Sequence, residues 1–516
     1  MLTHLIDADP VSIETLVSWA RSRDAFGFAP AALARLAADR QVVQAHLADG
    51  APVYGLNTGL GGNLGYRLGE DEVLAFQQQV IRGRMIGMGA ALPVEVVRAA
   101  LLSRAISLAR GGSGVSVPAA RALLALVDRG VTPVVPMLGS IGAGDLGLCA
   151  HMVAPLIGEG EADFQGRRLP GAQALDAAGL VPAPLQAKDG LGLINASPVT
   201  AGMAAIVADQ LAHSLLTAAA VAALSDEGYA ANPGILDVRI AAARPAGAQV
   251  GAAALFRALL AGSSLYDGPP RSIQDAISFR TVAQVFGAAY GQSAALRDAV
   301  HAEINGVSDS PVVFALQGDM VSTPNFHTSV LALAFDAMAI AMTHVASASV
   351  QRIIKLQTPH LSGLPKYLSP VGGASVGFNA LQKTAAAIHA EIRLQATPAS
   401  LDAIVVSDTV EDHATHALLA VRKLERQLRL LQNLLGIEAL VAAQAVDLRV
   451  GARLGAGTRC VFSAVRSVVP MLQQDRPPGA DAMAVAQALG DADWLRRLRE
   501  IARAGLKGQQ ALAGLE

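Results

Sequence analysis

The sequence is poor in the residues that build disulfide-stapled, thiolate-metal or nucleic-acid-binding proteins. Only two of its 516 residues are cysteines, Cys149 and Cys460, which are too few for a disulfide framework and suit a reducing compartment as buried free thiols. The formal net charge is -2 and no block of lysines and arginines occurs, whereas phosphate backbones are bound by clustered cations. We therefore expect no nucleic-acid partner.

Aromatic residues are also scarce, at 4% of the chain, while hydrophobic residues make up 52%, most of them alanine, leucine and valine. This composition favours helices packed on helices over sheets. The sequence predicts an all-α fold built as a long-helix bundle. We expect a loop-rich N-terminal domain over residues 1–200, and the central long-helix bundle with the C-terminal helices over residues 201–516.

Signals for membranes, export and metals are weak. The stretches 210–224 and 328–350 are apolar, but the first is short and the second contains Asp336 and His344, so we expect bundle helices and no membrane partner. The N-terminus MLTHLIDADP has no basic-then-apolar pattern, so a cytoplasmic location is expected. His413 and His416 share a predicted helical face but have no well-placed third ligand, so we predict no metal site.

Two glycine-rich segments interrupt the helical pattern, VYGLNTGLGGNLGYRLG over 53–69 and GVTPVVPMLGSIGAGDLG over 130–147. Irregular segments of this kind in compact enzymes usually have a function. Polar groups also lie in apolar surroundings, where charged side chains need partners. Several should converge on one polar site, although each alone is equally well explained as a satisfied helix end or a buried pair. These groups are Tyr54, Asn57, Lys188, Asn195, Gln274, Arg280, Asn325, Phe326, Lys383 and Glu411.

Taken in order, these segments resemble the aromatic amino-acid (histidine and phenylalanine) ammonia-lyases. VYGLNTGLGG resembles the family's tyrosine loop, GVTPVVPMLGSIGAGDLGLCAHM its prosthetic-group loop, KDGLGLINAS its KEGLALINGT segment, and QDAISFRTVAQVFGA its QDAYSLR segment. EINGVSDSPVVF, PNFHTS, ATPASLDAI and VVSDTVEDHATHA follow in the same order, from roughly residue 45 to 460 overall. The resemblance implies a fumarase/aspartase-like helical fold and a homotetramer whose active sites are built from several subunits.

The departures from the family pattern concern its electrophile and its substrate. The family loop reads Gly-Ala-Ser-Gly-Asp, and its Ala-Ser-Gly cyclises and dehydrates to a methylidene-imidazolone. Here Gly142-Ala143-Gly144-Asp145 has no serine, and no hydroxyl or thiol that could be expelled, so we expect no prosthetic group or other cofactor. Arg84 follows Gly83 where histidine-specific members have a Ser-His pair, and Ile277 replaces the tyrosine of QDAYSLR. Lys383 has no charged counterpart in the pattern.

Without the electrophile, a member of this family is either a binding protein or an enzyme whose substrate already carries a good leaving group. A trimethylammonium group is permanently cationic and departs as neutral trimethylamine. The resemblance then implies the ergothionase-like branch, which eliminates trimethylamine from ergothioneine to give thiolurocanate. The open alternatives are a lyase of another histidine-derived betaine such as hercynine, a non-catalytic binding paralogue, and an electrophile-dependent ammonia-lyase or aminomutase.

The resemblance implies catalytic and carboxylate-binding roles for four residues. Tyr54 is expected to take the β-proton as the general base. Phenols ordinarily ionise near pH ~10, so positive charge from Arg84 or from the substrate cation should assist it. Arg280 would hold the carboxylate as a bidentate fork, with Asn195 as a second donor, which fixes the Cα–Cβ bond for elimination.

The remaining expected residues contact the thioimidazole ring and the leaving group. Lys383 would donate to the thione sulfur, and Glu411 would accept from a ring N–H. Phe326 would offer its ring face to the methylammonium groups. The expected substrate-binding set is completed by Gly61, Gln274 and Asn325.

Overall fold

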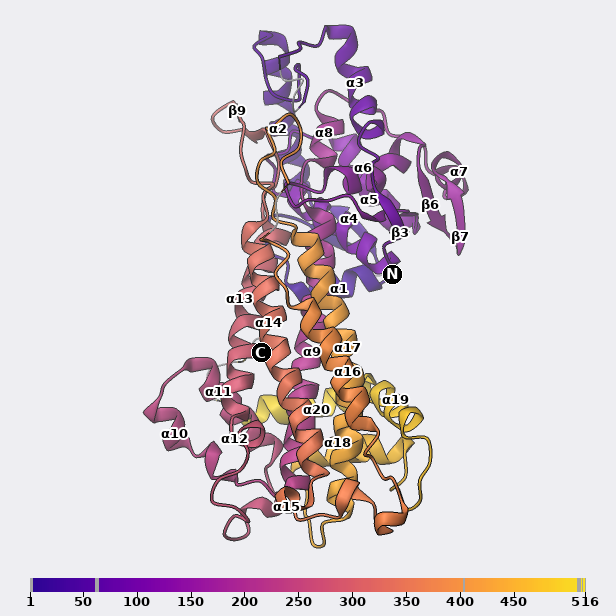
Figure 1. Cartoon of the computed structure of the whole chain (residues 1–516). Helices are drawn as coiled ribbons and strands as arrows, with labels where there is room; N and C mark the ends of the chain where they lie inside the picture. The colour runs from indigo at the N-terminus through magenta and orange to yellow at the C-terminus, as the bar shows by residue number, and fades with distance from the viewer. Residues whose placement is uncertain (1–2, 61–64, 402–403, 508–511, 513, 516) are drawn as a thin grey trace. The chain divides into compact units, whose positions relative to one another are not determined.

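The computed structural model of the chain describes residues 3–60, 65–401, 404–507, 512 and 514–515. They form two compact units, each made of three separate stretches of chain (Figure 1). The first unit comprises Met1–Asp209, Arg297–Phe335 and Pro398–Val421, and the second comprises Gln210–Leu296, Asp336–Thr397 and Arg422–Glu516. The sequence-based division at residue 200 lies close to the first of these boundaries. It differs from the structure in being continuous, because the chain returns twice to the first unit.

Four long helices contain boundaries between the units: α9 (Pro198–Tyr229), α13 (Val282–Asn305), α14 (Ser329–Leu356) and α17 (Ala417–Asp447). Their lengths of 32, 24, 28 and 31 residues agree with the long Ala/Leu-rich segments of the sequence. The predicted mostly helical, long-helix fold is therefore confirmed.

The first unit contains the shorter helices of the N-terminal half. They are α1 (Ile13–Arg21), α2 (Pro30–Asp49), α3 (Glu70–Arg82), α4 (Val94–Ala109), α5 (Val117–Arg129), α6 (Leu146–Val153), α7 (Gly171–Ala177), α8 (Asp189–Ile194) and the 3₁₀ helix η2 (Ala154–Ile157). α4 is buried on nearly every side, and α1, α2 and α5 pack against it. The sequence explains the ends of α2, since Pro30 occupies its first turn and Gly50 ends it with a left-handed φ of 71°.

Among its described residues the first unit also contains nine short strands, which the sequence pattern did not predict. They are β1 (Thr3–Ile6), β2 (Ala25–Phe28), β3 (Met88–Ala91), β4 (Thr132–Pro133), β5 (Pro136–Leu138), β6 (Glu161–Phe164), β7 (Arg167–Pro170), β8 (Val312–Phe314) and β9 (Asp319–Val321). β1 and β2 pair in parallel, while β3–β5, β4–β6–β7 and β8–β9 pair antiparallel. With two to four residues each, such strands are too short to produce a period-2 pattern.

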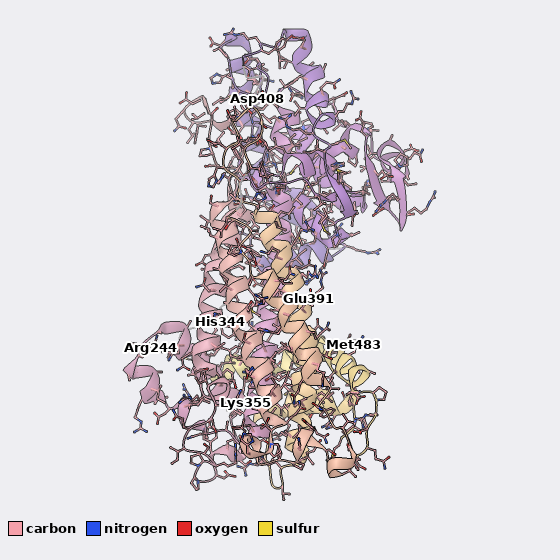
Figure 2. All side chains as sticks on the ribbon, in the orientation of Figure 1. Arg244, His344, Lys355, Glu391, Asp408 and Met483 are labelled. Atoms are coloured by element: carbon pink, nitrogen blue, oxygen red, sulfur yellow. The ribbon has the colours of Figure 1, made fainter. Side chains whose placement is uncertain are left out.

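The second unit packs its remaining helices around parts of α9, α13, α14 and α17. They are α10 (Val238–Ala243), α11 (Gly247–Leu259), α12 (Ile277–Arg280), α15 (Pro359–Ser362), α16 (Leu381–Gln395), α18 (Ala456–Val468), α19 (Pro478–Ala488) and α20 (Ala492–Gly505), with the 3₁₀ helices η3 (Pro233–Leu236), η4 (Ser264–Tyr266), η5 (Lys366–Leu368) and η6 (Gly372–Ala374). Side-chain hydrogen bonds tie α14, α16 and α17 together: Gln427 Nε2 donates to the carbonyls of Ala339 and Ile392, and Ser347 Oγ contacts His389 Nε2 at 2.7 Å. Figure 2 labels His344 and Lys355 on α14 and Glu391 on the neighbouring α16.

Two helical segments among the described residues are long and apolar enough, by length and composition alone, to cross a membrane. In Asp189–Tyr229 the most apolar window is completely buried inside the structure, and in Ser329–Leu356 that window is 56% buried. The expectation that both are bundle helices agrees with the burial of the first.

A buried ion pair holds α14 to α17 in the second unit. Arg352 Nε lies 2.5 Å from Glu438 Oε1 and Arg352 Nη2 lies 3.2 Å from Oε2, while Ser225 Oγ of α9 donates to Oε1 at 2.8 Å. The carboxyl of Asp226 lies in the same region, and burial raises its pKa well above its usual range. The positive charge of the Arg352 guanidinium therefore compensates the negative charge of acidic groups on two helices, Glu438 on α17 and Asp226 on α9.

We expect Arg352→Met to lower the free energy of unfolding by about 3–5 kcal/mol, because the substitution leaves Glu438 buried without its partner. Urea unfolding followed by circular dichroism measures the loss. The matched control is Arg429→Met, which breaks the exposed pair of Arg429 with Glu425 on α17 and should cost less than about 0.5 kcal/mol. Similar losses for the two variants would contradict a structural role for the buried pair.

Candidate active site

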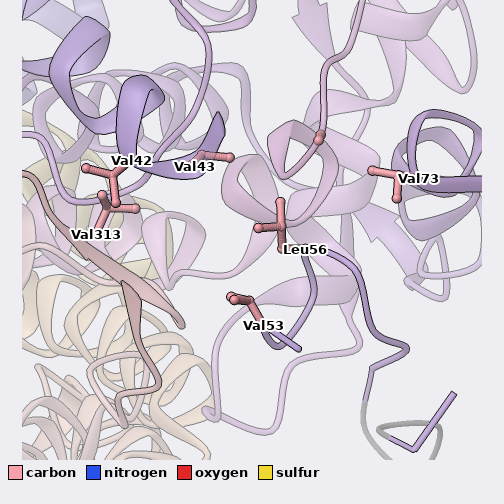
Figure 3. Close-up of a cluster of buried hydrophobic side chains, with 7 residues drawn as sticks. Val42, Val43, Val53, Leu56, Val73 and Val313 are labelled. Carbon is pink, nitrogen blue, oxygen red and sulfur yellow. The ribbon is translucent and has the colours of Figure 1, made fainter. Parts of the chain in front are cut away.

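Tyr54 is held on a tightly packed loop of the first unit. Its neighbours Val53 and Leu56 are buried in one hydrophobic cluster, while Tyr54 itself is half-buried. Figure 3 shows this cluster, which consists of Val42, Val43, Val53, Leu56, Val73, Ala187 and Val313. The cluster joins α2, the tyrosine loop, α3 and β8, so the backbone on both sides of the phenol is fixed by core packing.

Hydrogen bonds and a close backbone approach complete the fixation of this loop. Asn57 Oδ1 accepts from the backbone N–H of Val53 at 2.7 Å, and Asn57 Nδ2 donates to the carbonyl of Ala51 at 2.8 Å. Gly55 has a φ of +65°, and a Cβ there would overlap the Leu191 side chain of α8. The loop therefore lies directly on α8, and Asn57 is a structural residue of the loop.

Asn195 ends the same helix α8, which places it about one helical turn from Leu191 and hence near the tyrosine loop. The Asn195 side chain is only 5% exposed, and its Nδ2 donates to the carbonyl of Ser310 at 2.8 Å. The structure thus places Asn195 at the end of the helix on which the tyrosine loop lies.

Lys188, at the other end of α8, has a structural role. Its Nζ lies 3.6 Å from Asp309 Oδ1, and Arg104 Nη2 lies 3.2 Å from Asp309 Oδ2, with all three side chains fully buried. Burial lowers the pKa of Lys188 and raises that of Asp309, and the ion pair opposes both shifts. The network fixes the 308–310 segment, whose Ser310 carbonyl orients Asn195.

The 140–145 loop turns at the position where the family carries its prosthetic group. Asp145 is completely buried, and it accepts hydrogen bonds from Thr200 N and Thr200 Oγ1 of α9 and from Ser140 Oγ, at 2.7 to 2.8 Å. Burial raises the pKa of Asp145, and these hydrogen bonds oppose the rise. The Ser140 hydroxyl is thus used in a hydrogen bond to Asp145, and Ser140 does not replace the serine that the loop lacks.

Two distant segments bind the backbone of this loop. Thr328 Oγ1 and Thr415 Oγ1 lie 3.0 and 3.1 Å from the carbonyl oxygen of Gly142. The backbone N–H groups of Thr415 and His416 donate to the carbonyl of Ile141. The residues present do not fit the methylidene-imidazolone, because Gly142-Ala143-Gly144 lacks the serine from which it is made. The loop nevertheless remains closely bound.

Phe326 and Asn325 lie beside this loop in the first unit. The backbone N–H of Gly144 donates to the carbonyl of Phe326 at 3.0 Å, and Ser197 Oγ donates to the same carbonyl at 3.1 Å. Asn325 is exposed, with its Nδ2 3.4 Å from the carbonyl of Val307. Both residues therefore occupy the locality expected for substrate contacts.

Glu411 lies on an exposed turn that pairs with Val406, two residues before His413. The structure corrects one expectation here, since residues 411–416 are irregular and α17 begins only at Ala417. His413 and His416 therefore do not share a helical face. Instead, His413 Nδ1 lies 3.0 Å from His327 Nε2. Among the described residues, no group of three or more His, Cys, Asp or Glu side chains is arranged to hold a metal ion.

Arg84 lines a cavity of about 430 Å³ at the end of α3. Gly59 and Leu60 of the tyrosine loop line the same cavity, together with Tyr66, Leu68, Phe76, Gln79 and Val80. Arg84 therefore lies near the tyrosine loop. Gly61, which we expected to contact substrate, lies outside the described residues.

Gln274 and Arg280 lie in the second unit, where they line one cavity of about 380 Å³. The cavity is backed by Tyr229, whose ring stacks on Phe279 with ring centroids 3.9 Å apart. Arg271 lies over the ring of Tyr229, 4.7 Å from its centroid, and His360 also lines the cavity. Sequence reasoning did not single out Arg271, Tyr229 or His360. A basic residue just before the QDAISFR segment was the available signal for Arg271.

Lys383 lies in the first turn of α16 in the second unit, and its side chain is exposed. Among the described residues, Lys383 does not line the cavity that Gln274 and Arg280 share. The predicted residues therefore fall into three groups. Tyr54, Asn195, Arg84, Phe326, Asn325 and Glu411 belong to the first unit, Gln274 and Arg280 share a cavity in the second, and Lys383 stands apart in the second.

Gly142 offers a direct test of how tightly the 140–145 loop is constrained. Its φ is +83°, and a Cβ would overlap Thr415 Oγ1 and lie 2.9 Å from the His416 nitrogen. We expect Gly142→Ala to destabilise the protein by about 1–3 kcal/mol more than Gly166→Ala, because overpacking is added to the backbone strain. Gly166 is the matched control, since its φ is +77° and no atom lies within 4 Å of its Cβ position. Equal losses of unfolding free energy for the two variants, measured by urea unfolding, would show that the residues around Gly142 can move to accommodate a methyl group.

Comparisons with known proteins agree with this arrangement. Residues 11–467 match the aromatic amino acid lyase family. The histidine ammonia-lyase of Anaeromyxobacter sp. (strain K) is 38% identical over 510 residues, covering 95% of this chain and 99% of that protein. The histidine ammonia-lyase of Treponema denticola is 34% identical over 500 residues, covering 96% of this chain and 99% of that protein.

Solved structures show the same fold across nearly the whole chain. The ergothionase of Treponema denticola, in complex with desmethyl-ergothioneine sulfonic acid, superimposes with a TM-score of 0.91 at 31% identity, covering 95% of this chain and 98% of that chain. The histidine ammonia-lyase of Trypanosoma cruzi gives 0.88 at 28% identity, covering 97% and 96%. On this agreement of sequence and structure, the chain belongs to the aromatic amino acid lyase family and is a carbon–nitrogen lyase.

Proposed function

We propose that this lyase eliminates trimethylamine from ergothioneine to give thiolurocanate, without a methylidene-imidazolone or any other cofactor. One observation carries the proposal: the 140–145 loop lacks the serine needed for the electrophile, while tyrosine, asparagine and arginine remain at the catalytic positions of the family. The likeness to a solved ergothionase supports the same substrate. A non-catalytic binding paralogue is disfavoured because Tyr54, Asn195 and Arg280 are retained.

The leaving group explains why the electrophile is dispensable. An α-ammonium group must be activated before it departs, whereas a trimethylammonium group has no lone pair with which to attack an electrophile. The trimethylammonium group is permanently cationic, so it leaves as neutral trimethylamine without prior activation. The remaining task is to remove a weakly acidic β-proton while the Cα–N bond is held in line for elimination.

Tyr54 is the proposed base. Its phenolate takes the β-proton, the C–H electron pair forms the Cα=Cβ double bond, and the Cα–N pair leaves with trimethylamine. Core packing on both sides of Tyr54 supports this role, since the position of the phenol is fixed before substrate binds. Arg84 lines a cavity with Gly59 and Leu60 of the same loop.

Arg280 is the proposed carboxylate ligand. It lines a concave site with Gln274, in which Arg271 adds a second positive charge and Asp275 is the one acidic residue of the described lining, so cationic side chains outnumber acidic ones there. Asn195 supplies a further donor from the first unit. We propose that the carboxylate-binding cavity and the tyrosine loop of one active site come from different subunits, as the family resemblance implies.

Lys383 and Glu411 are proposed to recognise the thioimidazole ring. The Lys383 ammonium donates to the sulfur, where negative charge develops as the β-proton leaves, and Glu411 accepts from a ring N–H. Both side chains are exposed in the single chain, so each is available to a ligand shared between subunits. Phe326 is proposed to face the methyl groups of the cation, with Asn325 beside it.

A homotetramer in the cytoplasm is the proposed setting. Large apolar side chains stand exposed along α14 of the single chain, with Val330 73%, Leu333 60% and Ile340 44% exposed. A helix face of this kind is normally covered in an oligomer. The two cysteines are free, which suits a reducing compartment.

We expect the purified protein to release trimethylamine from ergothioneine and to produce the absorbance of a conjugated thiolurocanate. Tyr54→Phe should abolish turnover, because the ring remains and the base is lost, while Tyr66→Phe is the matched control, since Tyr66 is an exposed tyrosine of the same 53–69 segment. The intact mass should equal that of the unmodified sequence. Failure to form product over hours, or a mass lower by two waters, would reject the proposal.

Hercynine, the sulfur-free betaine, is the nearest rival substrate. If Lys383 contacts sulfur, the wild type should prefer ergothioneine, and Lys383→Met should lower kcat/KM for ergothioneine about 10- to 100-fold while changing that for hercynine much less. Steady-state rates of both betaines on one preparation measure this. Lys366→Met is the control, since Lys366 is a lysine of the same unit that lies over the ring of Tyr367. Equal rates of the wild type with ergothioneine and with hercynine would contradict the proposed contact between Lys383 and the sulfur.

A further inference from the structure

A chain of three side chains connects the segments that carry Phe326 and Glu411. Ser329 Oγ lies 2.8 Å from His327 Nδ1, and His327 Nε2 lies 3.0 Å from His413 Nδ1. The two imidazole rings are tilted by 44° with their centroids 5.0 Å apart, so they meet through their nitrogens rather than by stacking. In this N–H···N contact one ring donates and the other accepts.

This contact lies beside an exposed turn whose described backbone hydrogen bonds join its own residues. The turn 406–411 closes through backbone bonds between Val406 and Glu411. Between them, Ser407, Asp408 and Thr409 all have positive φ angles of 52° to 69°, which non-glycine residues rarely adopt. Figure 2 labels Asp408 in this exposed turn. Only one residue, Asp412, separates Glu411 from His413.

The partner of His413 is, by contrast, firmly held. His327 pairs through its backbone with Ala143, the preceding carbonyl of Phe326 accepts from Gly144, and the following Thr328 contacts the carbonyl of Gly142. Through the His327–His413 contact, the fixed 140–145 loop therefore also restrains the 406–411 turn. A metal does not explain the pair, because no third ligand is arranged with it among the described residues.

We propose that His327 and His413 are a positioning pair that fixes the carboxylate of Glu411 against the thioimidazole ring of the substrate. The inference rests on the proposed function, in which Glu411 accepts from the ring N–H. It adds that Glu411 acts only when its turn is tied to the PNFH segment. Neither histidine exchanges a proton with substrate in this scheme.

A double-mutant cycle on the full-length protein tests whether His413 acts through Glu411. His413→Leu should lower kcat/KM for ergothioneine about 10- to 100-fold, as expected for misplacement of a catalytic group. In the Glu411→Gln background, the same substitution should have almost no further effect, because the carboxylate that it positions is already gone. His301→Leu is the matched control, since His301 is an exposed histidine of the same unit and should leave the rate unchanged.

Conservative variants give a second readout that loss of folding would not mimic. An asparagine places an amide group where the His413 Nδ1 lies, and a glutamine does the same for the His327 Nε2. His413→Asn and His327→Gln should each recover most of the activity that His413→Leu and His327→Leu lose. Using both histidines ensures that the result does not depend on the stability of one variant.

The outcomes separate the inference from the function on which it rests. A wild type that releases no trimethylamine rejects the proposed function and the pair's role together. An active wild type with multiplicative losses in His413→Leu and Glu411→Gln rejects the positioning role alone, because the two residues then act independently. Unchanged activity in both leucine variants rejects it as well.

Discussion

The carbonyl oxygens of Ile141 and Gly142 are the points on which the rest of the site depends. They accept hydrogen bonds from Thr328, Thr415 and the backbone of His416, from segments nearly 190 and more than 270 residues further along the chain. Each donor comes from a short irregular segment that would otherwise have few partners. Backbone groups buried at such a junction must be paired, so the loop cannot move without releasing both segments. The positions of Phe326 and Glu411 therefore follow from the conformation of a loop that itself carries no reactive group.

This dependence explains how the loop can persist after losing its serine. The hydrogen bonds involve main-chain carbonyls and amides, and Asp145 anchors the loop to Thr200, so none of the interactions requires the missing hydroxyl. Gly142 and Gly144 retain positive φ angles of 83° and 79°, which preserves the turn. The structural function of the loop is thus separable from the chemical function that the family places on it.

The sequence allowed the helical fold and the family to be predicted, because these depend on composition and on motifs that remain contiguous. The same motifs supplied the candidate site residues. Pro30 and Gly50 mark the ends of α2, and Asn195 lies at the end of α8 where the KDGLGLINAS motif placed it. The discontinuous units could not be predicted, since local patterns do not show that the chain returns to the first unit after α13. Lys188 was singled out correctly as a buried cation, but only the contact with Asp309 shows that its role is structural.

The least predictable feature is the pairing of His327 with His413, because each belongs to a different motif and the spacing of His413 and His416 suggested a helix. What decides the conformation of that segment is the preceding turn, in which three consecutive residues adopt positive φ angles that no helix can contain. Strain of this kind persists only where surrounding interactions compensate it. The compensation here comes from the 140–145 loop through Thr415 and His416 on one side and through His327 on the other. In the function that we propose, a loop without the serine of the electrophile still contributes to catalysis, because it holds the segments that carry Phe326 and Glu411.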